Sequence, residues 1–127
     1  EWMTDNVTVV RYNDKLLQTD QKIQELMERY QNININDTAK WSNQGAMFTR
    51  NLENMLQLAR VITIGAYNRN ESRGAHYKPE FPERNDEEFL KTTMAKFAGS
   101  TVAPQFHYEE VDVSLIKPRK RNKKKKH

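Results

Sequence analysis

The sequence contains no cysteine, which excludes disulfide bonds, thiolate zinc sites and cysteine nucleophiles. Glycine is scarce too, with four in 127 residues and no two close together, so a glycine loop that cradles phosphate is absent. The most apolar stretch, residues 61–66, is far shorter than the roughly 20 residues that a membrane-spanning helix needs. The three histidines, His76, His107 and His127, are too scattered for a histidine metal motif.

A length of 127 residues suits one domain and leaves no room for a nucleotide-binding domain plus a separate substrate domain. The net charge of +4 depends on residues 117–127, which hold eight of the 21 basic residues and no acid. Without them, 13 basic side chains face 17 acidic ones, a net charge of −4. We therefore expect a folded domain over residues 1–116 and a basic, disordered tail over residues 117–127.

The tail has two interpretations. Eight positive charges can bind nucleic acid or anionic lipid by releasing counterions. However, no aromatic residue lies between these charges to stack on bases, which favours a solvated end with no specific nucleic-acid partner.

The first long helix is expected between Asn6 and Gln31, with Asp5 or Asn6 as its N-cap. Its apolar positions recur at steps of three, four or seven: Val9, Leu16, Ile23, Leu26, Met27 and Tyr30. The β-branched residues at 7–10 disfavour helix in the first turns. An asparagine-rich connector follows at residues 32–37, with room for a short extended piece through Ile33 and Ile35.

A second long helix is expected to begin between Ser42 and Thr49 and to run to Asn70. Its apolar stripe keeps helical spacing: Phe48, Leu52, Met55, Leu56, Ala59, Ile62 and Ala66. Gly74 suits the cap or the turn that follows. Two long antiparallel helices cannot bury both apolar faces against each other alone, so a third element is needed to cover them.

The rest of the folded part is shorter and less regular. Asn85 is an expected N-cap for a short helix through Leu90, with acidic residues 86–88 in its first turn. Alternating apolar residues after Thr92 and again from Phe106 to Leu115 predict a β-hairpin around residues 99–101. The predicted fold is mainly α: an antiparallel, spectrin-repeat-like helical bundle of two long helices plus a short third, then a small β-hairpin and the basic tail.

The densest polar cluster covers residues 69–77, at the exit of the second helix. In one interpretation Arg69 and Arg73 satisfy helix-end carbonyls and nearby carboxylates, while His76 packs in a polar interface. In the other, Arg and His polarise a carboxylate substrate, which requires a pocket that no neighbouring segment supplies.

The remaining candidates have simpler explanations. His107 and Glu109 share one face of a strand, which is more typical of an exposed polar edge than of a metal site. The acidic residues 86–88 fit a helix N-terminus better than a general acid/base pair.

Three segments carry a resemblance to a known family: residues 52–59, residues 69–76 (Arg-Asn-Glu-Ser-Arg-Gly-Ala-His) and residues 81–89 (Phe-Pro-Glu-Arg-Asn-Asp-Glu-Glu-Phe). From about Val9 to Pro118 the chain resembles the C-terminal domain of the flavoprotein subunit of succinate dehydrogenase and fumarate reductase. L-Aspartate oxidase carries a similar Glu-Ser-Arg-Gly segment. Ala75-His76 and the acidic turn after residues 81–84 favour the dehydrogenase.

The resemblance implies a parent subunit that oxidises succinate to fumarate, passing a hydride to FAD and electrons on to an iron-sulfur subunit. The motifs that bind FAD and clamp the substrate belong to other domains of that subunit and do not occur here. We therefore expect no catalytic, cofactor-binding or metal-binding residue in this chain, which should be inactive alone, with FAD held elsewhere in the parent.

What the resemblance assigns to this domain is a buttress packed on the flavin-binding domain, near the iron-sulfur subunit and linked to the membrane-anchor subunit only indirectly. Such a complex lies on the cytoplasmic side, at the inner face of the membrane. Glu71, Arg73 and His76 are the expected interdomain contacts, because a charged helix exit supplies directional hydrogen bonds. The chain departs from the family after Arg119, where a lysine run replaces a short ending with Arg and Tyr.

Overall fold

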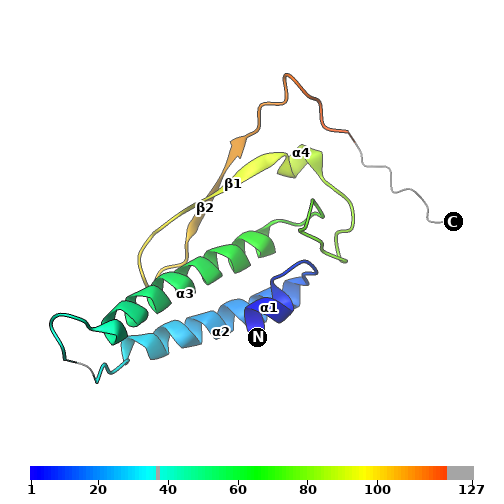
Figure 1. The fold of residues 1–127 in the computed structure, drawn as a ribbon. Helices are drawn as coiled ribbons and strands as arrows, with labels where there is room; N and C mark the ends of the chain where they lie inside the picture. Colours follow the sequence, from blue (N-terminus) through cyan, green and yellow to red (C-terminus); the bar gives the residue numbers. More distant parts are fainter. Residues whose placement is uncertain (37, 120–127) are drawn as a thin grey trace.

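The computed structural model describes residues 1–36 and 38–119 and is mainly helical, with one small sheet (Figure 1). In chain order its elements are α1 (Trp2–Asn6), α2 (Asn13–Gln31), α3 (Gln44–Asn68), α4 (Asp86–Phe89), β1 (Lys91–Lys96) and β2 (Gln105–Glu110). The predicted combination of two long helices, a short helix and a hairpin is confirmed. Most of the predicted basic tail, residues 120–127, lies outside the described residues.

The single helix expected over residues 6–31 is wrong at its start, because residues 7–12 separate α1 from α2. Tyr12, and neither Asp5 nor Asn6, is the N-cap residue of α2. The separating segment is held by a distant part of the chain: Tyr77 N donates to Val9 O and Arg11 N donates to Tyr77 O. The β-branched residues there disfavour helix, and these two hydrogen bonds replace the helical ones.

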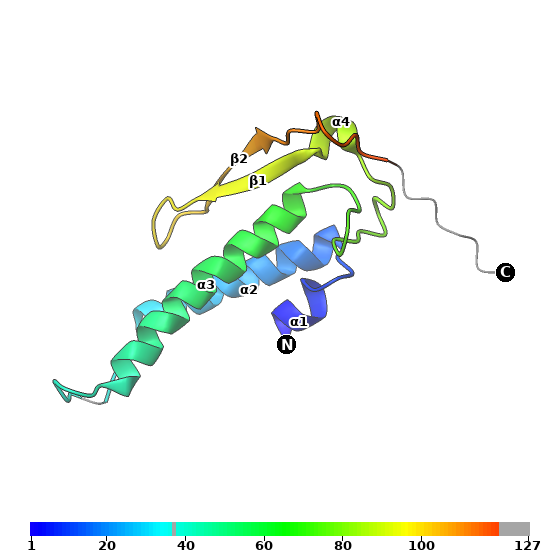
Figure 2. The same ribbon diagram turned by 45° about the horizontal axis from the view of Figure 1, so that its top comes forward.

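Helices α2 and α3 run antiparallel and side by side (Figures 1 and 2). A small core forms where α1 folds back on them, from Val7, Leu16 and Ala66, with Met3 and Tyr67 at its edge. Further along the pair, Arg60 Nε donates to Asp20 Oδ1 at 3.1 Å. This ion pair is largely buried and fixes the register of the two helices.

The start of α3 and the turn beyond its end follow local sequence signals. The helix ends at Asn68, two residues before the expected Asn70, and Arg69 rather than Gly74 is its C-cap residue. Asn43 caps its start, accepting a hydrogen bond from Ala46 N at 2.8 Å, within the predicted interval. Beyond its end, the chain reverses at Gly74, whose φ of +60° is the left-handed conformation that glycine adopts without steric cost. This reversal is closed by two backbone hydrogen bonds between Arg73 and His76.

The hairpin lies over α3 (Figure 2). Its strands pair antiparallel, from Lys91 opposite Glu110 to Lys96 opposite Gln105. A Cβ on Gly65 would come within 3.3 Å of the Phe106 ring, so this glycine allows the strand to approach the helix closely. The second strand ends at Glu110, earlier than the alternation through Leu115 predicts, and the Leu115 side chain is exposed.

The spectrin-repeat-like packing of the short helix is not confirmed. Helix α4 lies at the N-terminal end of β1 rather than alongside α2 and α3 (Figures 1 and 2). Part of the predicted apolar stripe of α3 is therefore uncovered: Phe48 and Met55 are 70% and 64% exposed. None of the helices in the described ranges is long and apolar enough to cross a membrane.

Candidate functional site

Ionisable side chains from three parts of the chain meet beyond the C-terminal end of α3. We call this cluster the polar junction and define it by Arg11, Arg69, Glu71, Arg73, His76, Lys78 and Asp86. The segment after α1, the loop over residues 69–85 and the start of α4 supply its members. It contains all three residues that the sequence singled out as contacts.

Glu71 is the central anion of the polar junction and is 0% exposed. Its Oε1 accepts from Arg69 Nε at 2.9 Å and Arg73 Nε at 2.8 Å, while Oε2 accepts from Arg73 Nη2 and Asn85 N at 3.0 Å each. Burial acts to raise the pKa of Glu71, but the hydrogen bonds from Arg73, Asn85 and Arg69 outweigh it, so the pKa is lowered. Glu71 is therefore a buried carboxylate that stays charged.

Arg69 connects Glu71 to the hairpin. Its Nη1 donates to Thr93 Oγ1 at 2.9 Å and to Lys91 O at 3.2 Å, and its Nη2 donates to Phe89 O. The guanidinium also lies 5.6 Å from the centre of the Phe89 ring. One arginine thus fixes α4 and β1 against the end of α3.

Arg73 connects Glu71 to the start of α4. Its Nη2 donates to Asp86 Oδ1 at 2.7 Å, and Arg84 donates to the other oxygen of Asp86 at 2.6 Å. Hydrogen bonds from Arg73 and Arg84 lower the pKa of Asp86. The acidic first turn of α4 is thus held by arginines, in addition to Asn85, whose side chain accepts from Glu88 N at 3.2 Å.

His76 bridges two arginines, and its hydrogen bonds determine its tautomer. Its Nδ1 lies 2.6 Å from Arg11 Nη1 and its Nε2 lies 2.9 Å from Arg69 O. Because a guanidinium can only donate, Nδ1 must accept and Nε2 must carry the hydrogen that is donated to the carbonyl. Burial and, to a lesser degree, the nearby cations lower the pKa of His76, so the ring is neutral at pH 7.

Lys78 is a fully buried lysine, 0% exposed. Its Nζ donates to Asn13 Oδ1 at 2.6 Å, Tyr67 O at 2.9 Å and Asn70 Oδ1 at 3.0 Å, which uses all three of its hydrogens. Burial lowers its pKa to about 8, and Glu80 only partly opposes this. Lys78 thus ties the start of α2 to the end of α3.

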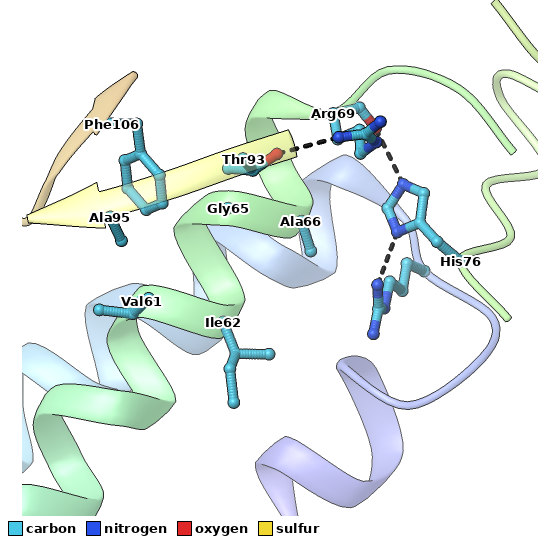
Figure 3. A pocket seen from close by; sticks show the side chains of 10 residues that line it. Val61, Ile62, Gly65, Ala66, Arg69, His76, Thr93, Ala95 and Phe106 are labelled. Atoms are coloured by element: carbon cyan, nitrogen blue, oxygen red, sulfur yellow. Dashed lines mark hydrogen bonds between the residues drawn. The ribbon is translucent and has the colours of Figure 1, made fainter. Parts of the chain in front are cut away.

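A shallow cleft of about 230 Å³ opens between α3 and the hairpin, next to the polar junction (Figure 3). Its apolar wall consists of Val61, Ile62, Gly65, Ala66, Ala95 and Phe106. Arg11, Arg69, His76 and Thr93 line its polar end. The arrangement can hold a small anionic group, but it contains no nucleophile with an adjacent base.

This cleft does not fit FAD, and the described residues do not fit a metal ion. The cleft is below the size range of ordinary cofactor pockets, and no glycine-rich turn leads into a helix beside it. Within residues 1–36 and 38–119 there is no group of three acidic or histidine side chains placed to hold a metal ion. His107 and Glu109 lie 3.9 Å apart on an exposed strand.

The structure brings Glu71 and Arg73 into direct contact and links His76 to them through Arg69. Sequence reasoning did not single out Arg11 or Lys78 for this cluster. Arg11 lies 65 positions from its partner His76, and Lys78 lies 65 positions from Asn13. No local pattern marks such pairs, whereas the polar run at residues 69–77 marked its own members.

Comparison with known proteins gives a consistent result. The family model described as "Fumarate reductase flavoprotein C-term" matches residues 1–123. The succinate dehydrogenase flavoprotein subunit of Bacillus subtilis is 76% identical over 99% of this chain and 22% of its own length. A fumarate reductase flavoprotein subunit of Haemophilus influenzae is 38% identical over 79% of this chain and 16% of its own.

Solved structures agree. An FrdA variant of Escherichia coli quinol fumarate reductase superposes with a TM-score of 0.87 and 30% identity, over 94% of this chain and 20% of the other. Mycobacterium smegmatis Sdh1 shares the fold, with a TM-score of 0.77 at 23% identity. This chain spans about a fifth of the length of these relatives. The chain belongs to the family of C-terminal domains of succinate dehydrogenase and fumarate reductase flavoprotein subunits.

Proposed function

We propose that this chain is the structural C-terminal domain of a succinate dehydrogenase flavoprotein subunit. The parent oxidises succinate to fumarate with FAD and passes electrons to an iron-sulfur subunit, while this domain packs against the flavin-binding domain. The observation that carries the proposal is 76% identity, over nearly the whole chain, to a subunit of that name.

The surface of α3 supports packing against a larger body. Five large apolar side chains along one side of the helix are 50–70% exposed: Met47, Phe48, Met55, Leu58 and Ile62. We call them the exposed α3 face. Contiguous apolar surface of this kind marks protein contacts, and the relatives contain about four times as much chain to cover it.

The role of this chain is structural rather than catalytic. The arginines and the histidine of the polar junction are engaged in bonds within the chain, and the cleft beside them does not fit FAD. No residue here is therefore assigned a catalytic, cofactor-binding or metal-binding role. FAD belongs to the parent subunit, where it accepts the hydride from succinate.

The proposed interdomain contacts are Glu71, Arg73 and His76, in different ways. The Arg73 side chain is 28% exposed and His76 is partly exposed, so both can touch a neighbouring domain. Glu71 is fully buried, and its part is to hold Arg69 and Arg73 in place. In the assembled complex the iron-sulfur subunit lies nearby, and the membrane-anchor subunit is reached only indirectly, at the inner face of the cytoplasmic membrane.

The dehydrogenase is favoured over two related parents. Identity falls from 76% with the Bacillus subtilis dehydrogenase subunit to 38% with the Haemophilus influenzae fumarate reductase subunit. A fumarate reductase remains the alternative parent, as does L-aspartate oxidase because of the shared Glu-Ser-Arg-Gly segment.

The test compares the purified chain with the complete parent subunit. The chain alone should show no flavin absorbance and no succinate-dependent dye reduction, whereas the complete subunit should show both. Either signal from the chain alone, or a complete subunit that prefers to reduce fumarate, contradicts the proposal.

A further inference from the structure

We propose that the cleft at Arg11 binds a carboxylate side chain, an Asp or Glu from the remainder of the parent subunit. The inference rests on the proposed function and names a contact within it. It makes Arg11, which is distant in sequence from the family motif, an anchor for the neighbouring domain.

The first observation is the incomplete bonding of Arg11. Its Nε donates to Val7 O at 3.1 Å and its Nη1 donates to His76 Nδ1 at 2.6 Å. Its Nη2 has no hydrogen-bond partner in the described part of the chain. Every buried side-chain nitrogen and oxygen there is satisfied, so this Nη2 must retain access to solvent. Half of the guanidinium is thus fixed, and the other half is free to donate.

The second observation is the charge balance around it. Arg69, Arg73 and Arg84 form ion pairs with Glu71 and Asp86. Arg11 and Lys78 have no carboxylate within 4 Å among residues 1–36 and 38–119. Lys78 is fully buried and its hydrogens are all used, which leaves Arg11 as the cation that can take an outside anion.

The third observation is the shape and lining of the cleft. Arg11 lines the cleft together with Arg69, His76 and Thr93. The opposite part of the lining is apolar and includes Val61, Ile62 and Phe106 (Figure 3). A carboxylate on one or two methylene groups matches this pattern, because the methylenes contact the apolar wall while the oxygens meet the guanidinium. Such a wall excludes water, and the lower local dielectric strengthens the charge-assisted hydrogen bond.

His76 acts as a positioning residue for this contact. It accepts from Arg11 through Nδ1 and donates to Arg69 O through Nε2, so a neutral ring orients the guanidinium without adding charge. Burial lowers the pKa of the Arg11 guanidinium relative to its ordinary value, as expected for a cation without a close anion.

The test is zero-length cross-linking in the complete parent subunit carrying Arg11→Lys. A carbodiimide joins an amine to a carboxylate only where the two are in direct contact, and peptide mass spectrometry then identifies the partner. The expected result is a link from position 11 to an Asp or Glu outside residues 1–127. The control is Arg29→Lys, an exposed arginine on α2, which should give no such link.

The outcomes separate the inference from the proposed function. Links from native lysines of this chain to the rest of the subunit report whether the domain is packed at all, and their absence contradicts the proposed function. If they are present and position 11 gives none, only the inference is overturned. With glutarate added as a probe, a mass increment at position 11 without a peptide link would assign the cleft to free anions and overturn it too.

A second measurement needs no variant. In the wild-type complete subunit, phenylglyoxal should modify Arg29 but spare Arg11, because the proposed carboxylate covers the free side of that guanidinium. Modification of Arg11 at the same rate as Arg29 overturns the inference.

Discussion

Glu71 holds the polar junction together, because two arginines and a backbone amide all donate to its buried carboxylate. A buried ion network of this kind is sensitive to the loss of one member, since the remaining charges are left uncompensated in a region that water cannot fully reach. The same carboxylate sets the position of the loop, α4 and the start of the hairpin.

Glu71→Gln removes the charge while keeping nearly the same shape. We expect it to lower the free energy of unfolding by about 3 kcal/mol, because Arg69 and Arg73 lose their anion. The measurement is urea unfolding of the chain at pH 7. The control, Glu25→Gln, breaks an exposed pair with Lys22 and should cost less than about 1 kcal/mol. Equal effects of the two substitutions would show that the buried network contributes no more to stability than an exposed ion pair does.

Lys78 makes the stability of the folded chain vary with pH in the alkaline range. Its pKa is lowered to about 8 from an ordinary value of 10.5, so between these values the unfolded chain binds more protons than the folded chain. The free energy of unfolding therefore rises with pH across that window, by about 2 kcal/mol between pH 8 and 10, because the cost of burying the charged amine is relieved as it loses its proton. Below pH 8 that cost is nearly constant.

This is measured as the difference in unfolding free energy between the wild type and Lys78→Met at several pH values. The free energy of unfolding of the wild type should increase relative to that of the variant from pH 8 to 10, because methionine does not titrate. A constant difference across this window would contradict the lowered pKa.

At the scale of elements, the helices and the hairpin follow local patterns, while the start of α2 follows tertiary contacts. The periodic stripe of α3 and its Asn43 cap are local signals, and the helix was predicted closely. The start of α2 was not, because the hydrogen bonds of Val9 and Arg11 to Tyr77 decide where the helix begins. These partners lie more than 60 positions apart.

The turn at Gly74 is an element whose requirement can be isolated. A Cβ there meets nothing within 4 Å, so a substitution acts on backbone conformation alone. Gly74→Ala should destabilise the chain by about 1 kcal/mol, since φ is +60°. Gly74→Asn should cost less, because asparagine tolerates this conformation better. The measurement is urea unfolding, and an alanine variant as stable as the wild type would be the contrary outcome.

At the scale of the whole molecule, the most informative feature is that α3 is only partly covered by the rest of the described chain. Phe106 of the hairpin packs at Gly65, while the exposed α3 face remains open to solvent. The periodic apolar stripe correctly predicted a need for cover, but not that the cover would be incomplete within this chain.

Leu58→Glu tests the role of the exposed α3 face. Leu58 is 61% exposed, so the variant chain should unfold with a free energy within about 0.5 kcal/mol of the wild type. In the complete parent subunit the same change should reduce the yield of assembled subunit in size-exclusion chromatography, because a charge is placed in an apolar contact. Gln21→Glu, at an exposed position of α2, is the control and should assemble normally.

The sequence by itself determined the helical periodicity, the interval in which α3 begins, the cap at Asn85, the turn at Gly74 and the family, because each depends on residues close together in the chain. Only the tertiary structure decided that Glu71 is buried, that Lys78 lies among Asn13, Tyr67 and Asn70, and that Arg11 is left with a free donor. These properties depend on burial and on pairing between distant segments. Desolvation and ion pairing act through space, so spacing along the chain does not encode them.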